Sequence, residues 1–494
     1  MKQNRREFLI KSSCALSMTA MATQMSHFGL MQAMAQKPNA KFKSESAVPS
    51  DYRALVLIFL SGGNDGNNTL IPNHNDANVS NYAAYSAARS GQGLSLPQNT
   101  LLPISVPRIG NLTYGLHPGF GTVTGGVNPG IHPLWATGKM AVVTNIGTLV
   151  APMTRAQYQN GSVPRPLQLF SHTDQVNQHQ NCRSDAMTLT GWGGRISDKI
   201  TQSDNPNRLV PTISSLAGTQ LFTIGDTTQP LTLSPAPTAL SNVLSLVGYN
   251  NTPMTNARFD ALYSSLDFNG NQELVTASNQ LHRRALDISR SLNTGSEVTV
   301  TFPNTDLGNQ LKQVARMIKT RSVLGVNRQI FFCTLGGFDT HTAQLPNQAA
   351  LFAQISQAMR AFYDEMTAQS LGNKVTQFTM SDFNRTFNPG GSGSNVGSDH
   401  AWANHSFVVG DSVLGGDFYG MNTSNGTPFP TLVQNGPDDA DSGTGARGRW
   451  IPTTSVEQYA ATMANWFGLQ AADTSYVFPN LSRFTTTNLG FMQP

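Results

Sequence analysis

The sequence predicts an α/β fold in which a mostly parallel central sheet is sandwiched by helices. Short, almost wholly apolar runs recur along the chain, segments with helical periodicity separate them, and most of the runs end in glycine or in a polar turn. A continuous apolar run of this length is typical of a strand covered on both faces, and strands that alternate with helices favour parallel pairing.

The first 35 residues are set apart from the fold because they resemble a twin-arginine export signal. Arg5 and Arg6 precede Lys11, a moderately apolar stretch covers 12–31, and small residues suited to cleavage occupy 33–35. An ordinary amphipathic N-terminal helix is the alternative. The signal makes the twin-arginine translocase a partner and predicts a periplasmic or extracellular protein.

The rest of the chain is predicted to be a polar linker, 36–52, and a single domain, 53–494, with an insertion near 205–300. Only 12% of the 494 residues are charged, and most of the formal net charge of +4 lies in the signal. The basic balance therefore predicts no nucleic-acid partner. No apolar run after the signal reaches transmembrane length, so no transmembrane segment is expected after signal removal.

Apolar runs and helical periodicity place the elements. The predicted strands cover 54–60, 141–146, 330–335, 375–380 and 407–409. The predicted helices cover 82–89, 191–200, 259–266, 274–292, 307–323, 349–368 and 456–467. The remainder of 73–130 is expected to be loop, and 210–252 to be peripheral strands or an insertion. Cys333 lies in an apolar run and is expected to be a buried packing residue, although pairing with Cys182 in an oxidising compartment stays open.

Carboxylates and imidazoles follow the ends of three predicted strands. Asp65 follows the first strand, Asp339 and His341 follow 330–335, and Asp382 follows 375–380, while His400 and His405 lie in the segment behind it. If the strands are parallel, these side chains gather at one edge of the sheet, where they repel one another unless a cation lies among them. Taken singly, each aspartate can be a turn former and each of the last two histidines an ordinary surface or hydrogen-bonded residue. Mixed oxygen and imidazole donors predict one or two divalent metals, Zn or Mn rather than Mg or Ca.

Seven blocks of sequence, in order, resemble the exported proteins of the domain of unknown function 1501 family. They are LVLIFLSGGNDGNNTLIP, LHPGFG with LWATGKMAVV, SHTDQ, TGWGGR, TLGGFDTH, SDFNRTFN followed by GSDH, and GRWIPTTSVEQYAATMANWFG with VFPNL. The resemblance covers nearly the whole mature chain. It implies an alkaline-phosphatase-like α/β/α core, as in sulfatases and phosphodiesterases, whose strand ends hold one or two divalent metals beside a nucleophile.

The same resemblance implies the roles of individual residues. Metal ligands are implied at Asp65, Asp339, His341, Asp382, His400 and His405. The chain departs from the family pattern at Phe383, which stands where the late Asp-His pair has its histidine, so His405 is the expected substitute.

The nucleophile is expected at a helix N-terminus, where the backbone N–H groups and the helix dipole favour an alkoxide and a bound oxyanion. Ser171 is the candidate, with Thr173 in reserve, and His172 or Asp174 is the base or an extra ligand. A plain helix cap is the alternative for Ser171.

Two functions are compatible with these observations. The first is a metal-dependent hydrolase of phosphate or sulfate esters in the cell envelope, acting on a small-molecule or polymer ester. The alternative is a non-catalytic exported binding or assembly protein on a phosphatase-like scaffold, which Phe383 and the loops rich in Asn, Gly and Ser favour.

Overall fold

The computed structural model describes residues 51–240, 252–266, 275–276, 279–280, 282–283 and 297–494. The expected signal, nearly all of the expected linker and most of the expected helix at 274–292 lie outside the described residues. Within the described part of the chain, no helix combines the length and the apolar character needed to cross a membrane.

The helices and strands follow the order that the sequence predicts, with additions. The helices are α2 (Gly66–Thr69), α3 (Tyr82–Arg89), α4 (Pro133–Ala136), α5 (Arg155–Asn160), α6 (His172–Asn181), α7 (Trp192–Asp204), α8 (Pro253–Ser265), α10 (Asp306–Lys319), α11 (Gln344–Ala368), α12 (Val456–Phe467) and α13 (Thr474–Val477). The strands are β1 (Arg53–Leu60), β2 (Leu70–Pro72), β3 (Leu102–Val106), β4 (Leu112–Leu116), β5 (Met140–Gly147), β6 (Ile213–Ser215), β7 (Leu231–Thr232), β8 (Arg328–Leu335), β9 (Val375–Ser381), β10 (Asn404–Val409), β11 (Phe418–Tyr419) and β12 (Thr454–Ser455).

Nine strands form the central sheet, in the order β11-β5-β10-β9-β1-β8-β6-β7, with β12 paired to β5. The pairs β1–β8, β1–β9, β6–β8 and β6–β7 are parallel, whereas β10 is antiparallel to both β5 and β9. The predicted fold class, a mostly parallel sheet between helices, is therefore confirmed. The strands β6 and β7 lie in the region predicted to be peripheral, and they extend one edge of the sheet.

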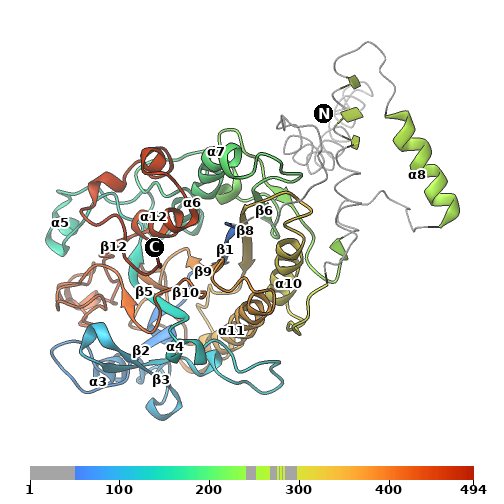
Figure 1. The fold of residues 1–494 in the computed structure, drawn as a ribbon. Coiled ribbons are helices and arrows are strands. Elements are labelled where there is room, and N and C mark those ends of the chain that lie inside the picture. Colours follow the sequence, from blue (N-terminus) through green and yellow to red (C-terminus); the bar gives the residue numbers. More distant parts are fainter. Residues whose placement is uncertain (1–50, 241–251, 267–274, 277–278, 281, 284–296) are drawn as a thin grey trace, which may run out of the picture.

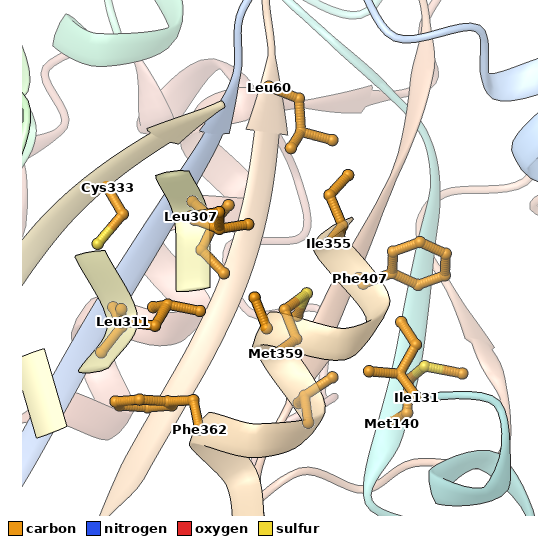
Figure 2. Packing of buried hydrophobic residues seen from close by; sticks show 14 of the residues in the cluster. Leu60, Ile131, Met140, Leu307, Leu311, Cys333, Ile355, Met359, Phe362 and Phe407 are labelled. Carbon is orange, nitrogen blue, oxygen red and sulfur yellow. The ribbon is translucent and has the colours of Figure 1, made fainter. Parts of the chain in front are cut away.

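Helices cover both faces of the sheet (Figure 1). Because successive strand residues point to opposite faces, Val56 and Ile58 of β1 enter the core shared with α10 and α11, while Leu55 and Leu57 enter the core shared with α7 and α12. Figure 2 shows part of the first core, where side chains of α10 and α11 pack against strand residues. The burial of β1 on both faces explains its unbroken apolar run.

Two sequence expectations needed correction in the fold. The segment 73–130, which we expected to be loop apart from the helix at 82–89, also contributes β3 and β4 to a small antiparallel sheet with β2. Pro103 and Gly115 lie inside these short strands and hide the strand pattern. Cys182 and Cys333 are both buried free thiols, so the disulfide left open by the sequence does not form.

A buried carboxyl group in α12 makes the stability of the protein depend on pH. Glu457 is completely buried, and burial raises its pKa to about 8. An unfolded chain ionises this group near its ordinary value of 4.5. Between these two values the folded protein holds a proton that the unfolded chain has lost, so each pH unit removes about 1.4 kcal/mol of stability.

We expect the isosteric amide variant Glu457→Gln to lack this dependence. Urea unfolding at pH 5, 6.5 and 8 should show wild type losing stability relative to the variant as the pH rises. The difference should level off above about pH 8, where both states of wild type are ionised. A wild-type minus variant difference that stays constant over this range would contradict the prediction.

Candidate metal centre

Three neighbouring parallel strands end at the same level of the sheet. Leu60 at the end of β1 pairs with Leu335 of β8 on one side and with Ser381 of β9 on the other. The residues that follow these strands therefore meet at one edge, as the sequence predicts. Asp339 and Asp382 are two of them.

The double glycine after β1 lets the three strand ends approach closely. Gly62 has a φ of +117°, and a Cβ built on it would lie 2.4 Å from the backbone nitrogen of Asp339. Its own N–H donates to the two carboxylate oxygens of Asp382, at 3.1 and 3.2 Å. Gly63 has a φ of +81°, and its Cβ would lie 2.4 Å from the ring of Phe383. Only glycine fits both positions.

Three imidazoles surround one carboxylate oxygen at this edge. Oδ1 of Asp339 lies 3.5 Å from Nε2 of His172, 3.0 Å from Nε2 of His341 and 3.5 Å from Nε2 of His400. The Nε2 atoms of His341 and His400 are 3.2 Å apart. His172 begins α6, and the other three residues lie in the loops behind β8 and β9. The ligand atoms of His172, Asp339 and His400 thus gather within 4.8 Å of one another, and Nε2 of His341 lies beside two of them.

Hydrogen bonds fix the ring orientation of two of these histidines. Nδ1 of His172 donates to Oδ2 of Asp382 at 2.8 Å, and Nδ1 of His400 donates to the backbone carbonyl of Phe170 at 2.8 Å. Because a carbonyl oxygen can only accept, the proton of a neutral His400 ring is on Nδ1 and its Nε2 has a free lone pair. Nε2 of His172 has no hydrogen-bond partner among the described residues.

The third histidine is held in the same way. Nδ1 of His341 lies 3.0 Å from Oδ1 of Asp399, whose other oxygen accepts from Arg447. In all three rings Nδ1 is therefore engaged outside the cluster and Nε2 points into it. Such outer partners are typical of metal-binding histidines, whose ring orientation and basicity they set.

Phe383, the departure from the family pattern, packs against two of these rings. Its ring centroid lies 4.7 Å from that of His172 and 4.6 Å from that of His400. The apolar ring of Phe383 thus packs against the imidazoles of His172 and His400, and it stands where the family pattern has a histidine. This contact gives Phe383 a structural role at the centre.

Arg385 adds a buried positive charge beside Asp339. Its side chain is fully buried, and Nη1 donates to Oδ1 of Asp339 at 2.6 Å. Partial burial acts to raise the pKa of Asp339, but the Arg385 hydrogen bond and charge, with His341 and His172 nearby, lower that pKa overall. The carboxylate is thereby kept ionised, the form that binds a cation.

The environment also shifts the pKa values of two of the histidines. The hydrogen bond to Asp382 is the main reason that the pKa of His172 is raised. Burial lowers the pKa of His400, which favours the neutral ring needed of a metal ligand.

The donor atoms fit a divalent transition metal. In a tetrahedral zinc site with bonds of about 2.0–2.1 Å, the donors lie roughly 3.3 Å from one another. Four of the six separations among these Nε2 and Oδ1 atoms are 3.0, 3.2, 3.5 and 3.5 Å, and the ligand atoms of His172, Asp339 and His400 all lie within 4.8 Å of one another. Arg385 offsets the charge of Asp339, but the Nε2 lone pairs of neutral His341 and His400 still face each other at 3.2 Å, an arrangement that a bound cation would stabilise. Three imidazoles and one carboxylate are donors that zinc and manganese accept, whereas calcium and magnesium prefer oxygen alone.

Two expected ligands lie outside this cluster. Asp65 is buried in an ion pair with Arg89, and its carboxylate also accepts from Gln344 and from the backbone N–H of Asn67. Its oxygens are therefore already engaged, which corrects the expectation that Asp65 is a ligand. His405, on β10, stacks on Phe429 with ring centroids 5.2 Å apart.

His405 is buried, and its Nδ1 accepts from the backbone N–H of Asn145 at 3.3 Å, so this imidazole is engaged in the core and is not a substitute ligand. A third correction concerns Asp382. It bonds Nδ1 of His172, the ring nitrogen opposite the cluster, and is not one of the four inward donors.

The expected pair of nucleophile and base is also arranged differently. Ser171 is the N-cap of α6, as predicted, and its Oγ donates to Oδ2 of Asp174 at 2.6 Å. The nitrogens of His172 face Asp382 and Asp339, so His172 belongs to the cluster and Asp174 is the proton acceptor beside the serine. Thr173 is exposed.

Sequence reasoning missed three supporting groups: Arg385, Arg447 and the carbonyl of Phe170. A signal existed for Arg385, which follows the strand-end Asp382 by three residues in the block SDFNR. A backbone carbonyl leaves no trace in a sequence.

Comparisons with known proteins give a family and a distant structural likeness. The family model described as Protein of unknown function (DUF1501) matches residues 52–429. No curated protein matches the chain. Three solved structures resemble it weakly. A crystal structure of Ps i-CgsB in complex with k-i-k-neocarrahexaose matches with a TM-score of 0.30 and 9% identity, covering 87% of this chain and 74% of that one.

The lipoteichoic acid synthase LtaP from Listeria monocytogenes matches with a TM-score of 0.24 and 7% identity, over 78% and 71% of the two chains. The PsFucS1 sulfatase from Pseudoalteromonas sp. matches with a TM-score of 0.26 and 9% identity, over 74% and 64%. Likenesses this weak carry no argument about activity.

Proposed function

This chain belongs to the DUF1501 family of proteins of unknown function, and on that premise we propose that it is an exported, metal-dependent hydrolase of phosphate or sulfate esters. The observation that carries the proposal is the convergence of three Nε2 atoms on Oδ1 of Asp339, with an outer hydrogen bond on every Nδ1. His172, His341, His400 and Asp339 would hold the metal.

We propose that each chain binds one metal ion. Asp65, the carboxylate that follows β1, forms an ion pair with Arg89, and both side chains are completely buried. Both oxygens of the buried Asp65 are thus engaged by Arg89, Gln344 and the N–H of Asn67. Asp339, in contrast, is half exposed and bonds Arg385 through Oδ1 alone, and His405 faces the core. The remaining inward donors are enough for a single ion.

Within the proposal, a bound divalent metal supplies the Lewis acidity that polarises the oxygens of the ester. The side chains around it have separate tasks. Arg385 keeps Asp339 ionised and in place. Ser171 is the proposed nucleophile, because it immediately precedes His172 and its Oγ proton already points at Asp174. Asp174 would accept that proton as Oγ attacks phosphorus or sulfur and the bond to the ester's alcohol oxygen breaks. The alcohol would leave with a proton from Asp174 or water, and a water molecule would then cleave the seryl ester to release phosphate or sulfate.

A binding protein without turnover is the second candidate. The short hydrogen bond from Ser171 to Asp174 can simply stabilise the first turn of α6, and Phe383 stands in place of a further donor at the site. Such a protein would hold a metal with the same four residues and leave esters intact.

A panel of esters separates the two candidates. Purified protein is incubated with Zn, Mn, Mg or Ca and with phosphate monoesters, phosphodiesters and sulfate esters. We expect turnover of at least one ester with Zn or Mn, and loss of that turnover to background in the double variant Asp339→Ala/His341→Ala. His132→Ala is the matched control, because its ring hydrogen-bonds the carbonyl of Pro103, which is not part of the cluster.

Turnover that survives in the double variant would contradict the site. No turnover anywhere in the panel, with the metal still bound, would contradict the hydrolase and support the binding protein.

A further inference from the structure

A cavity of about 430 Å³ opens at the end of β8, beyond the metal centre. It lies between the last residues of that strand, the first turns of α10 and the segment 235–238. Gly336 lines it and precedes Asp339 by only three residues. The cavity therefore opens at the same sheet edge that carries the proposed metal ligands, the edge at which α/β sheets bind their ligands.

Hydrogen bonds between its walls hold the cavity in shape. The side chain of Gln310 bonds both backbone groups of Thr334, donating to the carbonyl at 2.8 Å and accepting from the N–H at 2.9 Å. The N–H of Ala236 donates to the carbonyl of Asn309 at 3.2 Å, which ties the third wall to α10. The walls are thus connected without a ligand, as in preformed binding sites.

Among the described residues, the lining is polar and contains no cationic side chain. Hydroxyl, amide and carboxylate groups come from Thr238, Asn309 and Asp306, while Pro235 and Pro237 supply flat apolar faces. Asp306 is exposed, and its carboxylate can only accept hydrogen bonds when ionised. A second phosphate or sulfate group would meet this carboxylate with no positive partner in the lining, so an anionic ligand is disfavoured.

We propose that this cavity binds the uncharged, hydroxyl-rich part of the substrate, a short saccharide whose ester group reaches the metal centre. Hydroxyl groups can donate to Asp306 and exchange hydrogen bonds with the amide of Asn309, and the C–H faces of sugar rings can pack on the prolines. The volume lies within the range of about 300–1,000 Å³ of small-molecule sites. The idea rests on the proposed function for the ester, but saccharide binding needs no metal.

The chain offers a position from which the cavity can be filled. A Cβ on Gly336 would meet no atom within 4 Å, and its φ is outside the range reserved for glycine. The Cβ of Gly336→Trp therefore has open space, and its indole is attached at the lining of the cavity, where it competes with a ligand for that space. Gly91, in the turn after α3, also has open space around its Cβ and an ordinary φ, so Gly91→Trp is the matched control.

The test is direct binding of neutral trisaccharides, measured by saturation-transfer NMR on the full chain with and without EDTA. The probes are maltotriose, cellotriose and tri-N-acetylchitotriose, with triglycine as a peptide probe. We expect at least one trisaccharide to bind wild type and Gly91→Trp equally, and to bind Gly336→Trp at least tenfold more weakly. EDTA should leave this binding unchanged.

Three results would overturn the inference: no trisaccharide binds, triglycine binds in place of the saccharides, or Gly336→Trp binds like wild type. Saccharide binding without ester hydrolysis would reject the proposed hydrolase alone, and hydrolysis of simple aryl esters without saccharide binding would reject the cavity alone. The two failures are therefore distinguishable.

Discussion

Replacing His400 by alanine is expected to weaken zinc or manganese binding by at least about 100-fold. His400 supplies one of four inward donors, and its ring is already fixed by the Phe170 carbonyl, so wild type needs no rearrangement to bind. Changes to outer partners alone typically cost about 10–100-fold in metal affinity, and loss of a direct ligand costs more. Competition with a chromophoric chelator, together with metal analysis of the purified protein, measures the effect.

Two further variants make this experiment specific. Asp382→Asn keeps all four donors and alters the group that holds His172 and accepts from the Gly62 N–H, so we expect an intermediate loss of about 10–100-fold. His132→Ala should bind the metal like wild type. Equal affinity in wild type and His400→Ala would show that the four residues do not form the metal site.

Replacing Gly62 by alanine is expected to destabilise the protein by about 3 kcal/mol or more. A non-glycine residue at a φ of +117° is strained, and strain of this kind costs on the order of 1–3 kcal/mol. The new Cβ would in addition lie 2.4 Å from the backbone nitrogen of Asp339, so one strand end has to move. Urea unfolding of the two proteins measures the loss.

The same substitution should also weaken metal binding, because the displaced backbone carries Asp339. Gly91→Ala is the control, since its Cβ meets nothing within 4 Å, and we expect a change within about 0.5 kcal/mol. Should Gly62→Ala unfold at the same urea concentration as wild type, the close approach of the strand ends would be refuted.

The sequence predicted the sheet and part of the site because strand ends are visible in it. Apolar runs located β1, β8 and β9, and parallel pairing then placed the loops after these strands at one edge. Asp339, His341 and His400 meet there for that reason. The role of Asp65 was not predictable, since its partner Arg89 lies on a separate helix and nothing in the spacing indicates their contact.

The direction in which a side chain points was the second property of the site that the sequence could not predict. His405 lies five residues after His400, but it belongs to β10 and faces the core, whereas His400 lies before that strand. The sequence pattern places both histidines near the edge of the sheet. It does not tell which of them faces the cluster and which faces the core. The pairing of His172 with Asp382 was equally hidden, because it joins a helix start to a strand end.

His172 and Asp382 are 210 residues apart in the chain, so the proposed metal centre forms only when α6 and the ends of β8 and β9 have come together. An ion that binds this arrangement and not the unfolded chain stabilises the native state. At a free concentration 100 times its dissociation constant it contributes about 2.7 kcal/mol of stability. Resistance to proteases should therefore rise on metal loading and fall on chelation, whatever chemistry the site performs.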